Sequence, residues 1–181
     1  MRYRRVLQAG ATYFFTLVLH ERAGLLADAA NVGRWRAAVA KVQRKRPFVI
    51  EAEVILPDHL HVLWTMPDGD ADYATRIRLV KTEFTKALPF DGALATANKS
   101  RARKSESGVW QRRYWEHTIR DEHDFQVRLD YIHYNPVKHG LVARAADWPH
   151  STFQVWVEKG TYDPWWGSAD MPPFPEWARA E

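Results

Sequence analysis

The chain has 181 residues, a formal net charge of +4, 46% hydrophobic residues and no cysteine. This length fits one domain, or one domain with a tail, and the apolar content is enough for a core. Because there is no cysteine, disulfide frameworks and thiolate metal sites are excluded, and any metal would need histidine, carboxylate or amide ligands.

The charge is unevenly distributed along the chain. Acidic residues outnumber basic ones over residues 162–181, so the basic excess lies in residues 1–161. A basic body with an acidic tail fits a polyanionic partner, although ordinary solubility explains the same pattern. No run reaches 18 apolar residues and no apolar segment follows the basic N-terminus. We therefore predict a cytoplasmic protein with no membrane partner.

The first part of the chain predicts a strand, a helix and a hairpin. Residues 11–22 are aromatic and β-branched, which indicates a strand. Apolar residues at steps of three and four predict a helix over residues 27–45 that ends at Pro47. Two further strands, 48–56 and 59–66, are separated by a break too short for a crossover, so they must pair antiparallel.

The second part of the chain predicts two long helices. One spans residues 71–88, and the other begins at the N-cap Asp121 and ends at Pro136. The segments between and after them are a mobile basic loop (about 89–108), a fourth strand or irregular aromatic segment (109–119), a short helix (148–158) and an irregular tail (160–181).

The order β-α-β-β-α-β followed by a helix predicts an α+β fold. It is the ferredoxin-like, split β-α-β pattern, in which helices pack on an antiparallel sheet. We expect residues 1–145 to form the functional domain. Residues 146–181 would form a C-terminal extension and tail, and the acidic tail could compete with a polyanion for the basic surface.

The segment "LPDHLHVLW" places two histidines, His59 and His61, one residue apart on a predicted strand. Side chains at positions i and i+2 point to the same face, about 6.6 Å apart along the strand. Two imidazoles at this spacing can bind one metal ion, but they can equally be hydrogen-bonded histidines at a sheet surface. A third ligand is needed to decide between the two interpretations.

The segment "YIHYNP" offers that third ligand. Tyr131 and Asn135 are four residues apart and share one face of the late helix. Asn135 could reach the metal and leave Tyr131 beside it. Alternatively, Tyr131 is a packing residue and Asn135 is a helix C-cap.

Four segments together resemble the REP-associated tyrosine transposases of bacteria, relatives of the single-tyrosine HUH transposases: "PDHLHVLW", "VWQRRYWEHTIRDEHDF", "LDYIHYNPVKHGLV" and "DWPHSTF". The resemblance extends from "AGATYFFTLVL" to about Gly160 and implies the same ferredoxin-like fold. It implies that His59 and His61 bind Mg²⁺ or Mn²⁺ and that Tyr131 is the nucleophile. Insertion-sequence relatives have a glutamine as third ligand where this chain has the shorter Asn135.

The resemblance also implies a substrate and a reaction. The substrate would be single-stranded DNA at repetitive extragenic palindromes (REP), short hairpins with a flanking tetranucleotide. Tyr131 would attack the scissile phosphate, giving a 5′-phosphotyrosine and a free 3′-hydroxyl, and a second 3′-hydroxyl would rejoin the strand. The long C-terminal extension favours a monomer over the dimers of insertion-sequence relatives.

Basic and aromatic residues near these segments are candidates for DNA contact. Lysine and arginine would bind phosphates, and aromatic rings would stack on unpaired bases. The candidates are Arg4, Arg5, Lys81, Trp110, Arg112, Arg113, Tyr114, Trp115 and Lys138.

Two other functions also fit the sequence. One is a protein that binds nucleic-acid hairpins without cutting them. The other is a metal-dependent hydrolase of a small phosphoester, which the basic and aromatic body disfavours.

Overall fold

The structure, a computed structural model, describes residues 7–89 and 108–168. One four-stranded sheet forms its centre, with the strand order β2-β3-β1-β4 and antiparallel pairing throughout. The strands are β1 (Thr12–Val18), β2 (Val49–Ile55), β3 (His59–Thr65) and β4 (Trp115–Thr118). This order and the positions of the helices confirm the predicted ferredoxin-like α+β fold.

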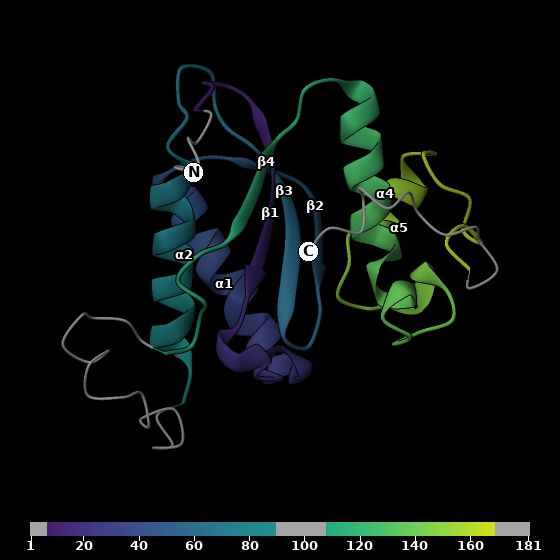
Figure 1. Ribbon diagram of the computed structural model, residues 1–181, viewed down its shortest axis with the longest axis horizontal. Helices are drawn as coiled ribbons and strands as arrows, with labels where there is room; N and C mark the ends of the chain where they lie inside the picture. Colours follow the sequence, from purple (N-terminus) through teal and green to yellow (C-terminus); the bar gives the residue numbers. More distant parts are fainter. Residues whose placement is uncertain (1–6, 90–107, 169–181) are drawn as a thin grey trace, which may run out of the picture.

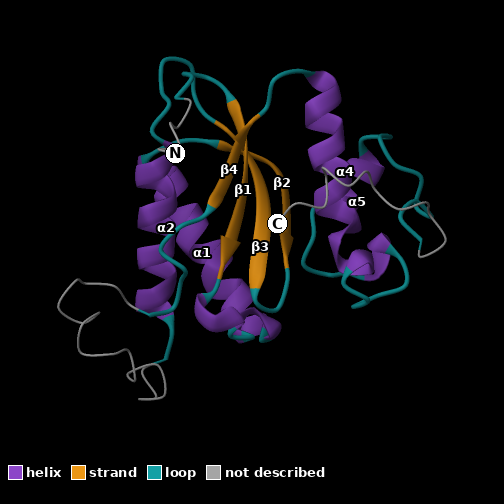
Figure 2. Cartoon of the chain, viewed as in Figure 1, coloured by secondary structure: helices purple, strands orange, loops and turns teal. Residues whose placement is uncertain are grey.

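Two helices cover one face of the sheet, and a third covers the other face (Figures 1 and 2). The first pair is α1 (Ala29–Lys45) and α2 (Tyr73–Ala87). On the opposite face lies α4 (Glu122–Lys138), followed by the short α5 (Phe153–Glu158). Three-residue 3₁₀ turns occur at His20–Arg22, Leu25–Ala27 and Ala145–Asp147.

Alternation along β1 and β3 supplies both cores. Phe15 and Val62 face α1 and α2 in a core that includes the fully buried Trp35. Phe14 and Leu63 belong to the second core, under α4. Burying one large apolar side chain stabilises the fold by about 1.5–3 kcal/mol, so each core holds its helices firmly against the sheet. His59 and His61 lie four and two residues before Leu63 on the same strand, so their side chains point to the same face of the sheet as Leu63 and face α4.

The start of α4 agrees with the prediction, but its end does not. The Asp121 side chain accepts a hydrogen bond from the Asp124 amide at 2.8 Å, as expected of an N-cap. The prediction that Pro136 ends the helix is wrong, because the helix continues to Lys138. Proline removes only its own N–H donor, and the His139 amide still donates to the Asn135 carbonyl at 3.0 Å. The extra residues keep Lys138 on the same helix as Tyr131.

Three other predicted elements are shorter or only partly described. The aromatic segment is irregular up to Tyr114, and only Trp115–Thr118 form a strand. The predicted helix over 148–158 is confined to α5. Most of the predicted mobile loop, Arg4, Arg5 and residues 169–181 lie outside the described residues, and the domain boundary at residue 145 stays a prediction.

The described part of the C-terminal extension packs along the outer edge of β2. The indole N–H groups of Trp148 and Trp156 donate to the carbonyls of Ile55 and Glu51 at 3.0 and 2.9 Å. Covering an edge strand in this way satisfies backbone groups that would otherwise be open to pairing with another chain.

Candidate active site

The two histidines of β3 lie together, buried on the face that α4 covers. His61 pairs with Thr16 and His59 with Val18 across the β1–β3 ladder. The ring centroids of the two histidines are 5.0 Å apart, with an interplanar angle of 86°. The prediction that both side chains point to one face is confirmed.

Each imidazole is oriented by a hydrogen bond at Nδ1. For His59 the partner is the Asp58 carboxylate, with 2.6 Å between Nδ1 and Oδ1, and for His61 it is the Thr16 hydroxyl at 2.9 Å. With Nδ1 engaged, the buried Nε2 atom of each ring is the nitrogen suited to a metal. Burial alone would raise the Asp58 pKa, but His59 and Arg22 lower it below its usual value. Asp58 therefore stays an anionic acceptor.

Tyr131 reaches this pair from α4. Its side chain is 3% exposed, and its ring centroid is 5.2 Å from that of His61 in an edge-on arrangement. Phe14 contacts both rings, at 5.5 Å from His61 and 5.9 Å from Tyr131. The Lys138 ammonium donates a hydrogen bond to the Tyr131 hydroxyl at 3.2 Å. The predicted nucleophile and one predicted ligand are thus in contact.

Asn135 lies one helical turn after Tyr131 and is completely buried. Among the described residues, neither its side-chain oxygen nor its nitrogen has a hydrogen-bond partner. Burying an amide without hydrogen-bond partners costs about 1–3 kcal/mol per unsatisfied group. Binding of the amide oxygen to a metal ion would recover part of this free energy. The described residues contain no group of three His, Cys, Asp or Glu that could bind a metal, and an amide oxygen is a ligand that Mg²⁺ accepts. The residues therefore fit a divalent ion on His59, His61 and Asn135.

A buried polar chain that the sequence analysis missed anchors α4. His133 Nε2 lies 2.9 Å from the Thr152 hydroxyl, and His133 Nδ1 lies 3.3 Å from the Tyr162 hydroxyl, which donates to Asp130 at 2.7 Å. Burial lowers the His133 pKa to about 3 and raises the pKa of Asp130 and of Tyr162. The network ties the helix that bears Tyr131 to the C-terminal extension. Only the proximity of His133 to Tyr131 in the sequence could have pointed to it.

The predicted DNA-contact residues separate into two groups in space. Trp110 and Tyr114 pack against the α1/α2 core. Lys81 lies with them, 5.4 Å from each ring centroid, and burial lowers its pKa to about 8. By contrast, Trp115 is 38% exposed on the histidine face, where its ring is 5.4 Å from that of Phe14. Arg112, Arg113 and Lys138 are exposed. Their roles in DNA contact stay predictions.

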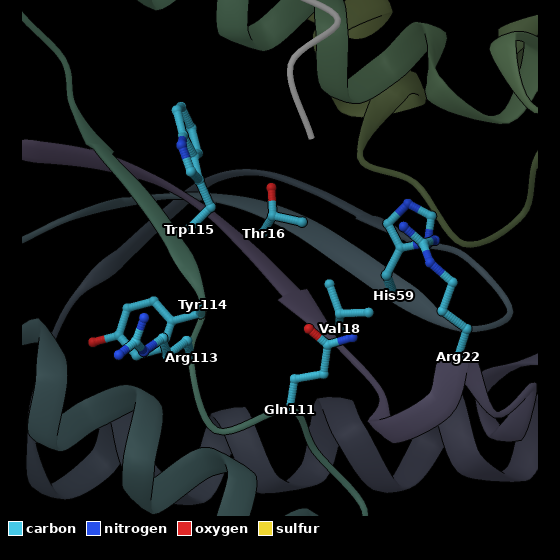
Figure 3. Close-up of a pocket in the computed structure, with 8 residues that line it drawn as sticks. All are labelled: Thr16, Val18, Arg22, His59, Gln111, Arg113, Tyr114 and Trp115. Carbon is cyan, nitrogen blue, oxygen red and sulfur yellow. The ribbon is translucent and has the colours of Figure 1, made fainter.

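A pocket of about 370 Å³ opens beside His59. Figure 3 shows Arg22 next to His59, Trp115 on the opposite side and Thr16 between them. The residues that line the pocket are Thr16, Val18, Arg22, His59, Gln111, Arg113, Tyr114 and Trp115. Arg22 reaches it from a backbone with φ of 50°, a conformation that costs side-chain-bearing residues about 1–3 kcal/mol. No sequence pattern singled out Arg22, because only the fold brings it to the histidines.

None of the helices in the described part of the chain is both long enough and apolar enough to cross a bilayer.

Comparison with known proteins identifies the family. No protein-family model matches the chain. A Haemophilus influenzae protein, provisionally named a REP-associated tyrosine transposase, is 45% identical over 171 residues, covering 93% of this chain and 95% of that protein. The REP-associated tyrosine transposase of Escherichia coli K12 is 41% identical over 160 residues, covering 88% and 87%. A solved structure of a REP-associated tyrosine transposase bound to a REP hairpin shares 40% identity with a TM-score of 0.76 over 96% of both chains. This chain therefore belongs to the REP-associated tyrosine transposases.

Proposed function

We propose that this chain cleaves and rejoins single-stranded DNA at REP-type hairpins, with Tyr131 as nucleophile and a divalent metal ion as cofactor. The observation that carries this proposal is the contact between the Tyr131 and His61 rings at 5.2 Å, beside His59. A nucleophile, two oriented imidazoles and a buried amide on one face are the groups that a phosphodiester transfer requires. The hairpin is proposed because the 40% identical relative is bound to a REP hairpin.

Tyr131 performs the covalent step. Its phenolic oxygen forms a bond to phosphorus while the bond from phosphorus to the 3′ oxygen breaks. The phenolic proton leaves to solvent, and the departing 3′ oxygen takes up a proton. The products are a 5′-phosphotyrosine and a free 3′-hydroxyl, and attack by a second 3′-hydroxyl reverses the step and joins new ends.

The histidines and Asn135 would hold Mg²⁺ or Mn²⁺ through the two Nε2 atoms and the amide oxygen. Such an ion supplies Lewis-acid polarisation of the scissile phosphate. The protein contributes the preorganisation, since Asp58 and Thr16 fix the two rings before substrate arrives. Phe14 sets the nucleophile against His61 by contacting both rings.

The surroundings suit an unpaired strand that passes the metal ligands. The pocket beside His59 offers Arg22 and Arg113 for phosphates and Trp115 for a base. Stacking of one base on an aromatic side chain contributes about 1–3 kcal/mol and tolerates any base. The hairpin and its flanking bases are therefore proposed to lie on the α4 face of the sheet.

The site also supports a monomer. Tyr131 contacts His61, and His61 contacts His59, within one chain. A second copy of the chain is therefore not needed to bring these three residues together. We expect the protein to act in the cytoplasm, where bacterial DNA is found.

The test is trapping of the covalent adduct. Wild type, Tyr131→Phe and the control Tyr134→Phe are incubated with a REP-type hairpin carrying single-stranded flanks, with Mg²⁺ or Mn²⁺, and resolved on a denaturing gel. Tyr134 belongs to the same motif but packs against Trp166, so its variant should still form the adduct. Cleavage by Tyr131→Phe would show that Tyr131 is not the nucleophile.

Two other outcomes distinguish the alternative functions. Tight hairpin binding by wild type without any adduct would favour a hairpin-binding protein that does not cut. Metal-dependent hydrolysis of a small phosphodiester, with no action on single-stranded DNA, would favour the phosphoester hydrolase.

A further inference from the structure

The Lys138 ammonium lies at the hydroxyl end of the Tyr131 ring. Its Nζ atom is 3.2 Å from the Tyr131 hydroxyl oxygen and 4.9 Å from the ring centroid. It is therefore closer to the attacking oxygen than to the aromatic face. Lys138 is exposed, whereas Tyr131 is buried, so the ammonium lies where the nucleophile meets solvent.

This position depends on the last turn of α4. Because the helix continues through Pro136, Lys138 stays two turns after Tyr131 on the same helix face. Val137 is buried and His139 packs 5.2 Å from His59, ring centroid to ring centroid. Contacts on both sides of Lys138 thus hold the last turn against the sheet, and the lysine is presented to the site by a fixed backbone.

We propose that Lys138 is a catalytic residue that binds a non-bridging oxygen of the scissile phosphate during both cleavage and rejoining. This inference rests on the proposed function and specifies the protein group that receives the phosphate. An atom that Tyr131 attacks must come within bonding distance of its hydroxyl oxygen. Since a phosphorus–oxygen bond is shorter than the 3.2 Å hydrogen bond, the phosphate oxygens then come within reach of the ammonium.

An ammonium can serve the hydroxyl and the phosphate together. It has three N–H donors and lies at the surface, so the group that donates to Tyr131 can also donate to an arriving phosphate oxygen. As the bond to the tyrosine forms and the bond to the 3′ oxygen breaks, negative charge on the transferring group stays next to the same cation. A preorganised charged donor at this place stabilises the transition state without reorganisation.

A purely structural role would have different consequences. If Lys138 only held the Tyr131 ring in place, its loss would slow attack on any phosphate to the same extent. If it binds the phosphate charge, its loss should matter much less when that charge is absent. A scissile methylphosphonate, in which an uncharged methyl group replaces one non-bridging oxygen, separates the two roles.

The experiment compares single-turnover adduct formation by wild type, Lys138→Met, Lys138→Arg and Lys159→Met. The substrate is a REP-type hairpin with single-stranded flanks, carrying either a normal or a methylphosphonate linkage at the scissile position. Lys159→Met is the matched control, because the Lys159 ammonium also contacts an aromatic ring, 4.2 Å from the ring centroid of Trp156, but it lies at the C-cap of α5. Thermal unfolding and hairpin affinity are measured for each variant.

On the normal linkage we expect Lys138→Met to form the adduct about 100-fold more slowly than wild type. Lys138→Arg should recover part of that loss, and Lys159→Met should match wild type. On the methylphosphonate the difference between wild type and Lys138→Met should fall below about 10-fold. Unfolding temperature and hairpin affinity should change little.

Equal rates for wild type and Lys138→Met on the normal linkage would overturn the inference but leave the proposed function intact. The same would follow from an equal loss on both linkages, which indicates that Lys138 only positions Tyr131. Failure of wild type to form any adduct would overturn the proposed function and this inference with it.

Discussion

Replacing Asn135 by leucine tests whether its amide is a metal ligand without relying on catalysis. In the described structure the amide is fully buried and neither polar atom has a hydrogen-bond partner. Leucine has a similar size and needs no partner. Removing an unsatisfied buried polar group recovers about 1–3 kcal/mol, so Asn135→Leu should raise the free energy of unfolding of the metal-free protein by about that amount.

The metal-dependent stabilisation should change in the opposite direction. An ion that binds only the folded state adds about 2.7 kcal/mol at a free concentration 100 times Kd. For a chain of this size that amounts to a rise in Tm of about 5–10 °C. If losing the amide weakens binding 10-fold, the same Mn²⁺ concentration adds only about 1.4 kcal/mol, and a 100-fold loss leaves about 0.4 kcal/mol.

The assay is thermal and urea unfolding of wild type, Asn135→Leu and Asn135→Asp across a Mn²⁺ titration. Asn135→Asp is the control variant, in which both stability and metal affinity should change in the direction opposite to that in Asn135→Leu. Its buried carboxylate should destabilise the metal-free protein and strengthen metal binding. A Mn²⁺-induced shift in Asn135→Leu as large as in wild type would refute ligation by Asn135. Lower stability of metal-free Asn135→Leu would refute the argument from the unsatisfied amide.

Three further predictions concern residues around the site. Asp58→Asn weakens the acceptor of the His59 Nδ1–H group and should lower Mn²⁺ affinity about 10–100-fold in a calorimetric titration; unchanged affinity would remove Asp58 from the metal site. Trp115→Ala should weaken binding of a hairpin with single-stranded flanks by about 1–3 kcal/mol while leaving a flankless hairpin unaffected, as measured by fluorescence anisotropy; equal effects on both would exclude stacking on the flank. Burial raises the Glu53 pKa despite the hydrogen bond from Trp35. The folded state therefore favours the protonated carboxyl group, so the stability that Glu53 contributes is complete below its unfolded pKa near 4.5 and is lost as pH rises through the raised folded pKa. In urea unfolding, the free energy of unfolding of Glu53→Gln should exceed that of wild type only slightly at pH 4, and the difference should grow by up to about 1.4 kcal/mol per pH unit above pH 4.5. A difference that does not depend on pH would contradict burial of an ionisable group.

Local patterns were sufficient for most of the fold. Apolar spacing predicted α1 and α2, and the short break at Pro57 and Asp58 required the β2–β3 hairpin. The spacing of His59 and His61 put both on one face, because strand geometry alternates independently of the rest of the chain. The family resemblance of four short segments was confirmed by the comparison with known proteins.

Errors occurred where a local rule competed with tertiary packing. Proline normally ends a helix, but the last turn of α4 is held by the burial of Val137 and the contact of His139 with His59. Tyr114, just before β4, and Trp115, its first residue, have similar aromatic side chains. Only the path of the chain as it enters β4 decides that Tyr114 packs against the α1/α2 core and that Trp115 lies on the histidine face.

The sequence by itself determined the chemical groups of this protein, two histidines on one strand face and a tyrosine and asparagine on one helix face, since such spacing follows from backbone repeat distances alone. Tertiary structure decided which groups meet. The β1–β3 register puts Thr16 beside His61, the docking of α4 brings Tyr131 to the same ring, and the continued helix places Lys138 at the tyrosine hydroxyl. These contacts join residues far apart along the chain through the packing of two cores, and no local spacing encodes them.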